Sequence, residues 1–190
     1  MSDMENGTTR VSRDLSEVTI ESERLILRPI SLEYDEDIFR EFHDEVTQYL
    51  IHGPDESIEQ ADEFITESVQ QAKHGASLKL VATSKQGEFL GLIELKKANT
   101  KTPEFGLWLK VSAQGKGFGP EMVNALYKWA SQNLDVDYFE YRADADNDRS
   151  WKIAEKLVAE NGGKYAGETS EEVRGQQRIT KLYKILPNKL

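Results

Sequence analysis

A glycine-rich segment, "SAQGKGFGPE" at residues 112–121, is the part of the chain best suited to bind an anion. Three glycines and a lysine share its central positions, and Pro120 and Glu121 follow at once. Glycines let backbone N–H groups approach a phosphate without a blocking Cβ, and proline is well tolerated in the first turn of a helix. Because a helix N-terminus presents unpaired N–H groups and partial positive charge, the segment predicts a phosphate-binding loop.

Two nucleotide-binding patterns do not fit this loop. The P-loop pattern G-x-x-x-x-G-K-[ST] fails because Lys116 is followed by Gly117 and no glycine lies at the required distance upstream. The dinucleotide pattern G-x-G-x-x-G fails because its third glycine position is Pro120. A third pattern, Q-x-x-G-x-G, is matched by Gln114, Gly117 and Gly119, between a predicted strand and a predicted helix.

On this third pattern the chain resembles the Gcn5-related N-acetyltransferases, the GNAT family, in which the loop holds the pyrophosphate of acetyl-CoA. The resemblance covers roughly residues 22–186. The subfamily that acetylates the N-termini of ribosomal proteins contains similar segments in the same order: "ESERLILRPI", "GLIELKK", "EFGLWLKVSAQGKGFGPEMVNALYKWA" and "NDRSWKIAEKL". The resemblance implies direct acetyl transfer from acetyl-CoA to an amine without a covalent enzyme intermediate. The absence of cysteine from the sequence is consistent with that.

The resemblance also implies which residues hold the cofactor. In the family, the strand before the loop is splayed from the next parallel strand, and the pantetheine arm lies in the gap. Here that strand is residues 104–111, with Leu109 and Val111 offering backbone groups. The implied cofactor-binding residues are Leu109, Val111, Gln114, Gly115, Lys116, Gly117, Phe118, Gly119, Asn147 and Ser150.

Acetyl transfer to an amine requires a free nitrogen lone pair, so the site needs a base for a protonated acceptor. Glu104, ten positions before Gln114, lies close to where several family members keep a glutamate base, and Glu94 is the second candidate. A solvated glutamate at a strand end is the plain alternative for Glu104. An alkylamine has a pKa of about 10.4 and an α-amine about 7.7–8.0, so a base matters more for the alkylamine.

"NDRS" at residues 147–150 supplies the second half of the predicted chemistry. Relatives use N-x-x-S to contact CoA and to place a hydroxyl near its sulfur, which assigns these roles to Asn147 and Ser150. Both residue types are also common helix caps, and a dual use is favoured. Many family members carry a tyrosine acid seven residues after this asparagine, but that position is Ala154, so Ser150 is the predicted catalytic group near the leaving thiolate.

The sequence gives little support for a metal site. Asp144, Asp146, Asp148 and Glu155 match acidic positions of an EF-hand calcium loop, but Arg149 occupies the position that needs glycine. The three histidines stand far apart without ligand-like spacing. No metal is therefore expected.

The elements that position these residues follow from hydrophobic periodicity and from helix caps. Ser57 and Gln60 form a predicted capping box, and Gly162 and Gly163 close the last helix. The predicted strands are 24–30, 77–84, 88–97, 104–111, 136–143, 164–169 and 176–185, and the predicted helices are 31–44, 57–74, 120–134 and 147–161. Alternating helices and strands between hairpins predict a single α/β-type (α+β) domain, in which about four helices cover a mixed central sheet.

Residues 1–18 are predicted to be a flexible tail, and residues 19–190 are predicted to form the domain.

The composition of the chain argues against several classes of protein. The net charge of −10 argues against a general nucleic-acid binder, and no stretch is apolar enough for a membrane span or a secretion signal. We expect a cytoplasmic protein, monomer or homodimer, whose partner is an amine acceptor. A protein N-terminal amine is the acceptor that the resemblance favours; a polyamine or aminoglycoside and a non-catalytic acyl-CoA sensor are the alternatives.

Overall fold

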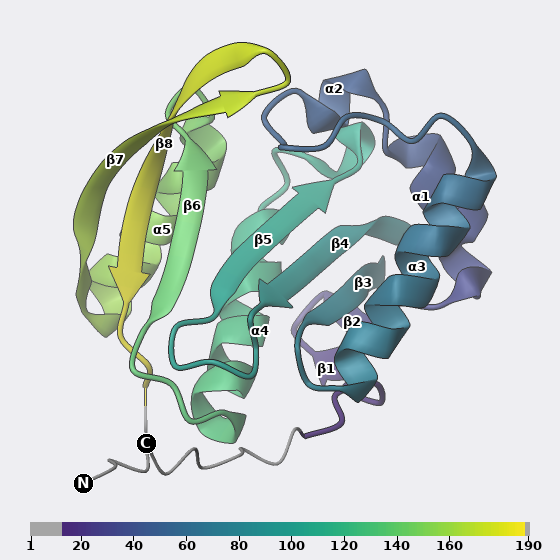
Figure 1. Ribbon diagram of the computed structural model, residues 1–190. Helices are drawn as coiled ribbons and strands as arrows, with labels where there is room; N and C mark the ends of the chain where they lie inside the picture. The colour runs from purple at the N-terminus through teal and green to yellow at the C-terminus, as the bar shows by residue number, and fades with distance from the viewer. Residues whose placement is uncertain (1–12, 189–190) are drawn as a thin grey trace, which may run out of the picture.

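Eight strands form one mixed sheet in the computed structural model, which describes residues 13–188 (Figure 1). The strand order is β1-β2-β3-β4-β5-β6-β8-β7, and every neighbouring pair is antiparallel except β5 and β6. The strands are β1 (Ile20–Glu21), β2 (Leu25–Pro29), β3 (Leu78–Ser84), β4 (Phe89–Lys96), β5 (Glu104–Leu109), β6 (Phe139–Asp144), β7 (Gly163–Val173) and β8 (Gln176–Ile185). The predicted mixed sheet is confirmed.

Five α-helices pack on this sheet, with one short helix beyond the four predicted. They are α1 (Asp35–Glu41), α2 (Asp44–Thr47), α3 (Ile58–Lys73), α4 (Phe118–Asn133) and α5 (Asp148–Asn161), with 3₁₀ turns η1 (Leu32–Tyr34) and η2 (Val111–Ala113). Figure 1 shows α4 and α5 behind β5 and β6, and α1 and α3 beside β3 and β4 on the other face. On that second face, β5 and β6 have no helix over them (Figure 1).

The two faces have separate apolar cores because side chains of a strand alternate between them. Leu80 and Ala82 of β3 join the large cluster under α4 and α5, while Val81 joins the smaller cluster under α1 and α3. β3 is therefore buried on both faces, which explains the continuous apolar run of Leu80, Val81 and Ala82 at its centre. In β2 the predicted alternation is confirmed, since Leu25 and Leu27 are fully buried.

Several predicted local features differ from the structure. Helix α4 begins at Phe118, two residues before Pro120, with Gly117 as its N-cap. The strand expected to run to Val111 ends at Leu109, because the last hydrogen bond to β4 joins Lys110 N–H to Leu90 O and the chain then turns into η2. The predicted capping box does not form: the Ser57 side chain makes no cap, and Gln60 Oε1 accepts from Glu56 N–H at 2.8 Å, one residue before the N-cap.

The last hairpin reaches across the molecule. β7 extends to Val173, four residues beyond the predicted strand end, because Arg174 and Gly175 both adopt positive φ in a tight turn. Arg174 then donates to Thr47 O at 2.9 Å, and Arg178 of β8 donates to Gln48 O at 2.6 Å. These bonds tie the hairpin to the end of α2, as the crossing of β7 and β8 towards α2 in Figure 1 illustrates.

The predicted flexible tail falls partly outside the described residues, which begin at 13. Of the six tail residues described, Leu15 is 1% exposed and its N–H donates to Ala72 O at 2.9 Å, while Arg13 donates to Asn133 O. Packed chain is therefore present well before residue 19. Within residues 13–188, no helix is long and apolar enough to cross a membrane.

Candidate active site

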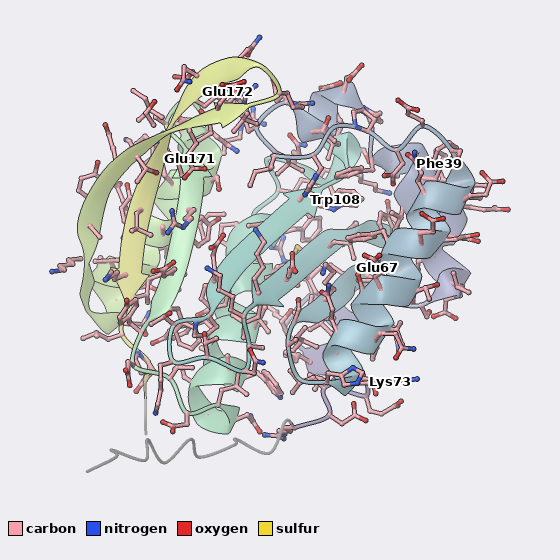
Figure 2. All side chains as sticks on the ribbon, in the orientation of Figure 1. Phe39, Glu67, Lys73, Trp108, Glu171 and Glu172 are labelled. Atoms are coloured by element: carbon pink, nitrogen blue, oxygen red, sulfur yellow. The ribbon has the colours of Figure 1, made fainter. Side chains whose placement is uncertain are left out.

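A cleft of about 480 Å³ opens where β5 and β6 separate. These parallel strands pair only at Glu104 with Glu140 and at Phe105 with Tyr141, so the rest of β5 has lost β6 as its neighbour. The splay expected from the sequence resemblance is therefore present. Residues of both strands line the cleft, together with residues of α3, β3, β4, β7, β8, the start of α5 and the segments that follow α1 and α2. Figure 2 labels Trp108 on β5 and Glu171 on the β7 side of this open face.

The glycine loop lies between η2 and α4 and has the backbone geometry of an anion site. Gly117 adopts a left-handed conformation (φ 81°) that puts it in the N-cap position of a 16-residue helix. Such a conformation strains any residue with a Cβ, and it leaves the first N–H groups of the helix without intrahelical partners. Lys116 and Phe118 flank Gly117. The loop therefore fits the phosphates that acetyl-CoA carries.

Gly119 is needed for packing rather than for backbone freedom. A Cβ added there would lie 3.3 Å from Ile153 Cδ1 and 3.6 Å from Leu107 Cδ1. The glycine thus lets the start of α4 pack closely against both α5 and β5. This packing places the glycine loop beside the point where β5 and β6 separate.

Two arginines fix the loop in place, and sequence reasoning did not select them. Arg149 donates to Gln114 Oε1 at 3.3 Å, and Gln114 Nε2 in turn donates to the Leu109 carbonyl at 3.1 Å. Arg24 donates to Lys116 O at 3.0 Å and forms an ion pair with Glu121 at 2.7 Å. These contacts bring cationic groups to the loop, although the protein carries a net charge of −10.

Glu121 links the first turn of α4 to the start of β2. Burial acts to raise the pKa of Glu121, but hydrogen bonds from Ser22 Oγ, from Arg24 N–H and from the Arg24 guanidinium outweigh it, so the pKa is lowered. The carboxylate is thus anionic and well held, and it also stands favourably at a helix N-terminus.

The two residues predicted to offer backbone groups to the pantetheine arm, Leu109 and Val111, lie in different elements. Leu109 is the last residue of β5, as expected, and its carbonyl already has Gln114 as a donor. Val111 lies in η2, where its carbonyl accepts from Gln114 N–H at 3.1 Å. Its expected place in an extended strand is therefore wrong, because the chain turns into η2 directly after Lys110 N–H donates to Leu90 O.

Asn147 and Ser150 lie at the start of α5, beside the cleft. Asn147 is the N-cap residue, and its Oδ1 accepts from Ser150 N–H at 3.2 Å, which confirms the predicted capping role. Ser150 Oγ lies 3.1 Å from the hydroxyl of Tyr141 on β6. Ala154, one turn further along α5, is fully buried.

Tyr141 is a candidate site residue that sequence reasoning missed. It is 1% exposed, yet it contributes to the wall of the cleft. Burial raises its pKa to about 12, against a smaller lowering by the hydrogen bond with Ser150. The phenol is therefore neutral at physiological pH. Its only sequence signal was an alternating strand pattern, which is equally typical of a core tyrosine.

The two candidate bases, Glu104 and Glu94, both line the cleft on the open face of the sheet. Glu104 is 8% exposed, and its carboxylate lies 3.3 Å from Lys96, 3.9 Å from Lys97 and 3.5 Å from Arg142.

Glu94 lies one step further along the same face, opposite Gly106 in the ladder. Its Oε1 accepts from Ser77 Oγ at 2.9 Å and from Lys79 Nζ at 2.8 Å.

The remaining acidic residues of the cleft are paired as well. Asp144 accepts from Arg178 at 3.0 Å, and Glu171 lies 3.7 Å from Arg142. Four carboxylates thus face four lysine and arginine side chains in the cleft, namely Glu94, Glu104, Asp144, Glu171, Lys79, Lys96, Arg142 and Arg178. The cleft is close to neutral, in contrast with the protein as a whole.

An apolar wall completes the side of the cleft opposite the hairpin. Its side chains come from α3, β4, β5 and the segments that follow α1 and α2: Phe42, Tyr49, Leu50, Ile51, Phe64, Leu92 and Trp108. Trp108 packs against Phe42 with ring centroids 5.2 Å apart. Ile51 and Phe64 are among the most exposed large apolar residues of the described chain.

The EF-hand-like spacing does not gather its acidic residues around one point. Asp144 ends strand β6 and pairs with Arg178, and Asp148 pairs with Lys152 on α5. Within residues 13–188, no cluster of three or more histidine, aspartate or glutamate side chains is arranged to hold a metal ion.

Comparisons with known proteins agree with this geometry. Residues 24–159 match the family model described as the acetyltransferase (GNAT) domain. A search of curated protein sequences found no significant match.

Many solved structures share the fold. RimL, the ribosomal L7/L12 α-N-protein acetyltransferase in complex with coenzyme A, has a TM-score of 0.76 at 19% identity, covering 89% of this chain and 98% of that one. An acetyltransferase from Salmonella typhimurium that modifies the N-terminal serine of L7/L12 gives 0.75 at 19% identity, covering 89% and 99%. Spermidine N-acetyltransferase from Vibrio cholerae, with CoA and spermine, gives 0.75 at 22% identity, covering 87% and 96%.

Proposed function

The chain belongs to the GNAT family of N-acetyltransferases and uses acetyl-CoA as its acetyl donor, and we propose that its acceptor is the N-terminal amine of a polypeptide. The structural neighbours include enzymes for both protein and polyamine acceptors, so the choice between these classes rests on the cleft itself. The observation that carries the proposal is the pairing of every carboxylate lining the cleft with a lysine or arginine.

A polyamine or aminoglycoside carries several cationic groups, which need several carboxylates to bind. Here each such carboxylate would first have to give up a partner such as Arg178, which lies 3.0 Å from Asp144. An α-amine instead brings a single charge, and with a pKa of about 7.7–8.0 it is partly neutral near physiological pH. A near-neutral cleft therefore favours an acceptor that carries one weakly basic amine.

The apolar wall supports the same acceptor class. Trp108 lies on β5 beside the splay, and Phe42 packs against it. A peptide places its first side chain next to its amine, and burying an apolar side chain against such a wall contributes roughly 1.5–3 kcal/mol. We therefore expect peptides with a large apolar first residue to bind better than those with a charged one.

Different residues of the chain bind the cofactor and orient it for the reaction. When bound, acetyl-CoA supplies an acyl thioester with an electrophilic carbonyl carbon. Residues 114–119 would hold its phosphates, and the backbone of Leu109 would orient the pantetheine arm. Asn147 caps the start of α5, where the Ser150 hydroxyl would be available to the sulfur of bound acetyl-CoA.

Glu104 acts as the base that takes one proton from the acceptor amine through a water molecule. Its ion pairs with Lys96, Lys97 and Arg142 fix the carboxylate beside the splay. Glu94 is the alternative base, and Lys79 and Ser77 both contact the same one of its two oxygens.

The test is a panel of acceptors assayed by release of the CoA thiol. It contains peptides that differ only in the first residue, one peptide with a blocked N-terminus, and spermidine. We expect turnover with free N-terminal peptides, none with the blocked peptide, and at least tenfold lower kcat/KM with spermidine. Faster turnover of spermidine would overturn the acceptor class, and acetyl-CoA binding without turnover of any amine would indicate a sensor.

The base is tested in the same assay with two matched variants. Glu104→Gln is expected to lower kcat by about 10²-fold or more, the usual contribution of general base catalysis, with little change in acetyl-CoA affinity. Glu94→Gln serves as the comparison. If only Glu94→Gln lowers kcat, Glu94 and not Glu104 is the base.

A further inference from the structure

The pair formed by Tyr141 and Ser150 contains a hydrogen bond whose direction matters for the chemistry. The two hydroxyl oxygens lie 3.1 Å apart, one on β6 and one in the first turn of α5. Either hydroxyl is able to donate. If Ser150 donates to Tyr141, a lone pair of Ser150 is left for the cleft. If Tyr141 donates to Ser150, the Ser150 proton is free to point elsewhere.

The surroundings favour donation by Tyr141. Its phenol is buried, and Ser150 Oγ is its hydrogen-bond partner among the described residues. A buried hydroxyl donor that lacks an acceptor costs free energy, so the phenol proton is expected to remain on the Ser150 oxygen. The serine hydroxyl has the cleft as an alternative direction for its own proton, because Ser150 also contributes to the cleft wall.

We propose that Tyr141 is a positioning residue, whose phenol donates to Ser150 Oγ and so directs the Ser150 proton towards the sulfur of CoA. This inference rests on the proposed function, because it takes Ser150 to face that sulfur. The acceptor nitrogen forms its bond to the acyl carbon, the C–S bond breaks, and its electron pair stays on sulfur. One amine proton passes to the base, and Ser150 donates only a hydrogen bond to the negative charge on sulfur.

Tyr141 does not transfer its proton through Ser150 to the sulfur. A thiol has a pKa of about 8.5. Burial raises the pKa of Tyr141 to about 12, so its phenol is a much weaker acid than the thiol that would form. The thiolate is therefore protonated by solvent after it has left, and the two hydroxyls act by orientation and hydrogen bonding.

Tyr141→Phe is the variant that tests the proposal, because it removes one oxygen and keeps the buried ring. Tyr127→Phe is the matched control. Tyr127 is equally buried, and its hydroxyl donates to Leu186 O at 2.8 Å, away from the cleft lining. We expect Tyr141→Phe to lower kcat by about tenfold, the value of one hydrogen bond, with KM for acetyl-CoA unchanged. Tyr127→Phe should leave both constants unchanged.

A binding measurement makes the test independent of turnover and of the acceptor. Calorimetry compares CoA with desulfo-CoA, which lacks the sulfur, between pH 7 and pH 9. In the native protein, affinity for CoA relative to desulfo-CoA should rise as the thiol ionises, since the Ser150 proton stabilises the thiolate. Tyr141→Phe should flatten this rise to the level of Ser150→Ala, and the double variant should behave like Ser150→Ala alone.

Two results would overturn the inference. One is an unchanged pH dependence of relative CoA affinity in Tyr141→Phe. The other is an equal, additive loss of kcat in the native and Ser150→Ala backgrounds, because a hydroxyl that acts through Ser150 has no effect once Ser150 is gone. A failed acceptor panel with an intact pH-dependent preference for CoA would refute the acceptor assignment but leave the positioning role standing.

Discussion

Replacing Gly117 by alanine tests the cofactor loop through a single Cβ. Gly117 has φ 81° and ψ 6°, and the nearest atom to an added Cβ is a side-chain nitrogen of Arg24 at 3.4 Å. The space is therefore open, and the cost within the protein is conformational. A left-handed non-glycine residue costs about 1–2 kcal/mol.

This conformational free energy lowers either the stability of the fold or the affinity for acetyl-CoA. If the loop keeps its shape, the free energy of unfolding falls, and each 1 kcal/mol lowers the melting temperature by about 2–4 °C for a chain of this size. If the loop relaxes, binding must restore its shape, and 1–2 kcal/mol weakens acetyl-CoA binding by about 5–30-fold. The Cβ also occupies space where the backbone must approach a phosphate, so affinity is expected to fall in either case.

Gly87→Ala is the matched control for strain. Gly87 has φ 89° in the turn between β3 and β4, and no atom lies within 4 Å of an added Cβ. It should cost similar stability and leave affinity unchanged. Calorimetric titration with acetyl-CoA and a thermal melt of each variant complete the experiment. If Gly117→Ala binds acetyl-CoA as tightly as Gly87→Ala does, the phosphates do not lie on this loop and the assignment is wrong.

Two further predictions concern stability around the same site. Asn147→Ala should lower the free energy of unfolding by about 1 kcal/mol, because the N-cap of α5 is lost, while Asn147→Asp keeps an acceptor for Ser150 N–H and should melt near the native temperature. The pKa of Glu121 is lowered in the folded state, so its stabilising effect is present above the ordinary glutamate value and is lost as pH falls through the lowered pKa. Unfolding followed between pH 6 and pH 3 should therefore show a shallower acid loss for Glu121→Gln than for the native protein; an identical slope would mean that the contacts with Arg24 and Ser22 do not stabilise the fold.

Local features were predictable from the sequence because near neighbours in the chain encode them. The alternation in "RLILRPI" placed Leu25 and Leu27 on a buried face, and the glycine loop between a strand and a helix was placed correctly. The Asn147 cap was predicted from residue type and position, and the structure contains it. Each of these depends on the geometry of a few consecutive residues.

Element ends were less predictable, because partners elsewhere in the fold decide them. The sequence pattern predicts that Val111 lies in a strand, but β5 ends at Leu109 and the chain turns away from β4 into η2. In the same way β7 extends as far as β8 continues to pair with it, to Val173. Strand propensity alone does not contain this information.

What the sequence by itself determined is the chemistry that one segment can perform: a loop that binds an anion, a serine at a helix start, and glutamates on strands. Only the tertiary structure decided which groups meet. The register of β5 against β6 brings Arg142 to Glu104, the packing of α5 on β6 brings Tyr141 to Ser150, and the position of β2 brings Arg24 to the glycine loop. These pairings depend on the order of strands in the sheet, and hydrophobic periodicity is the same for every order that buries the same faces.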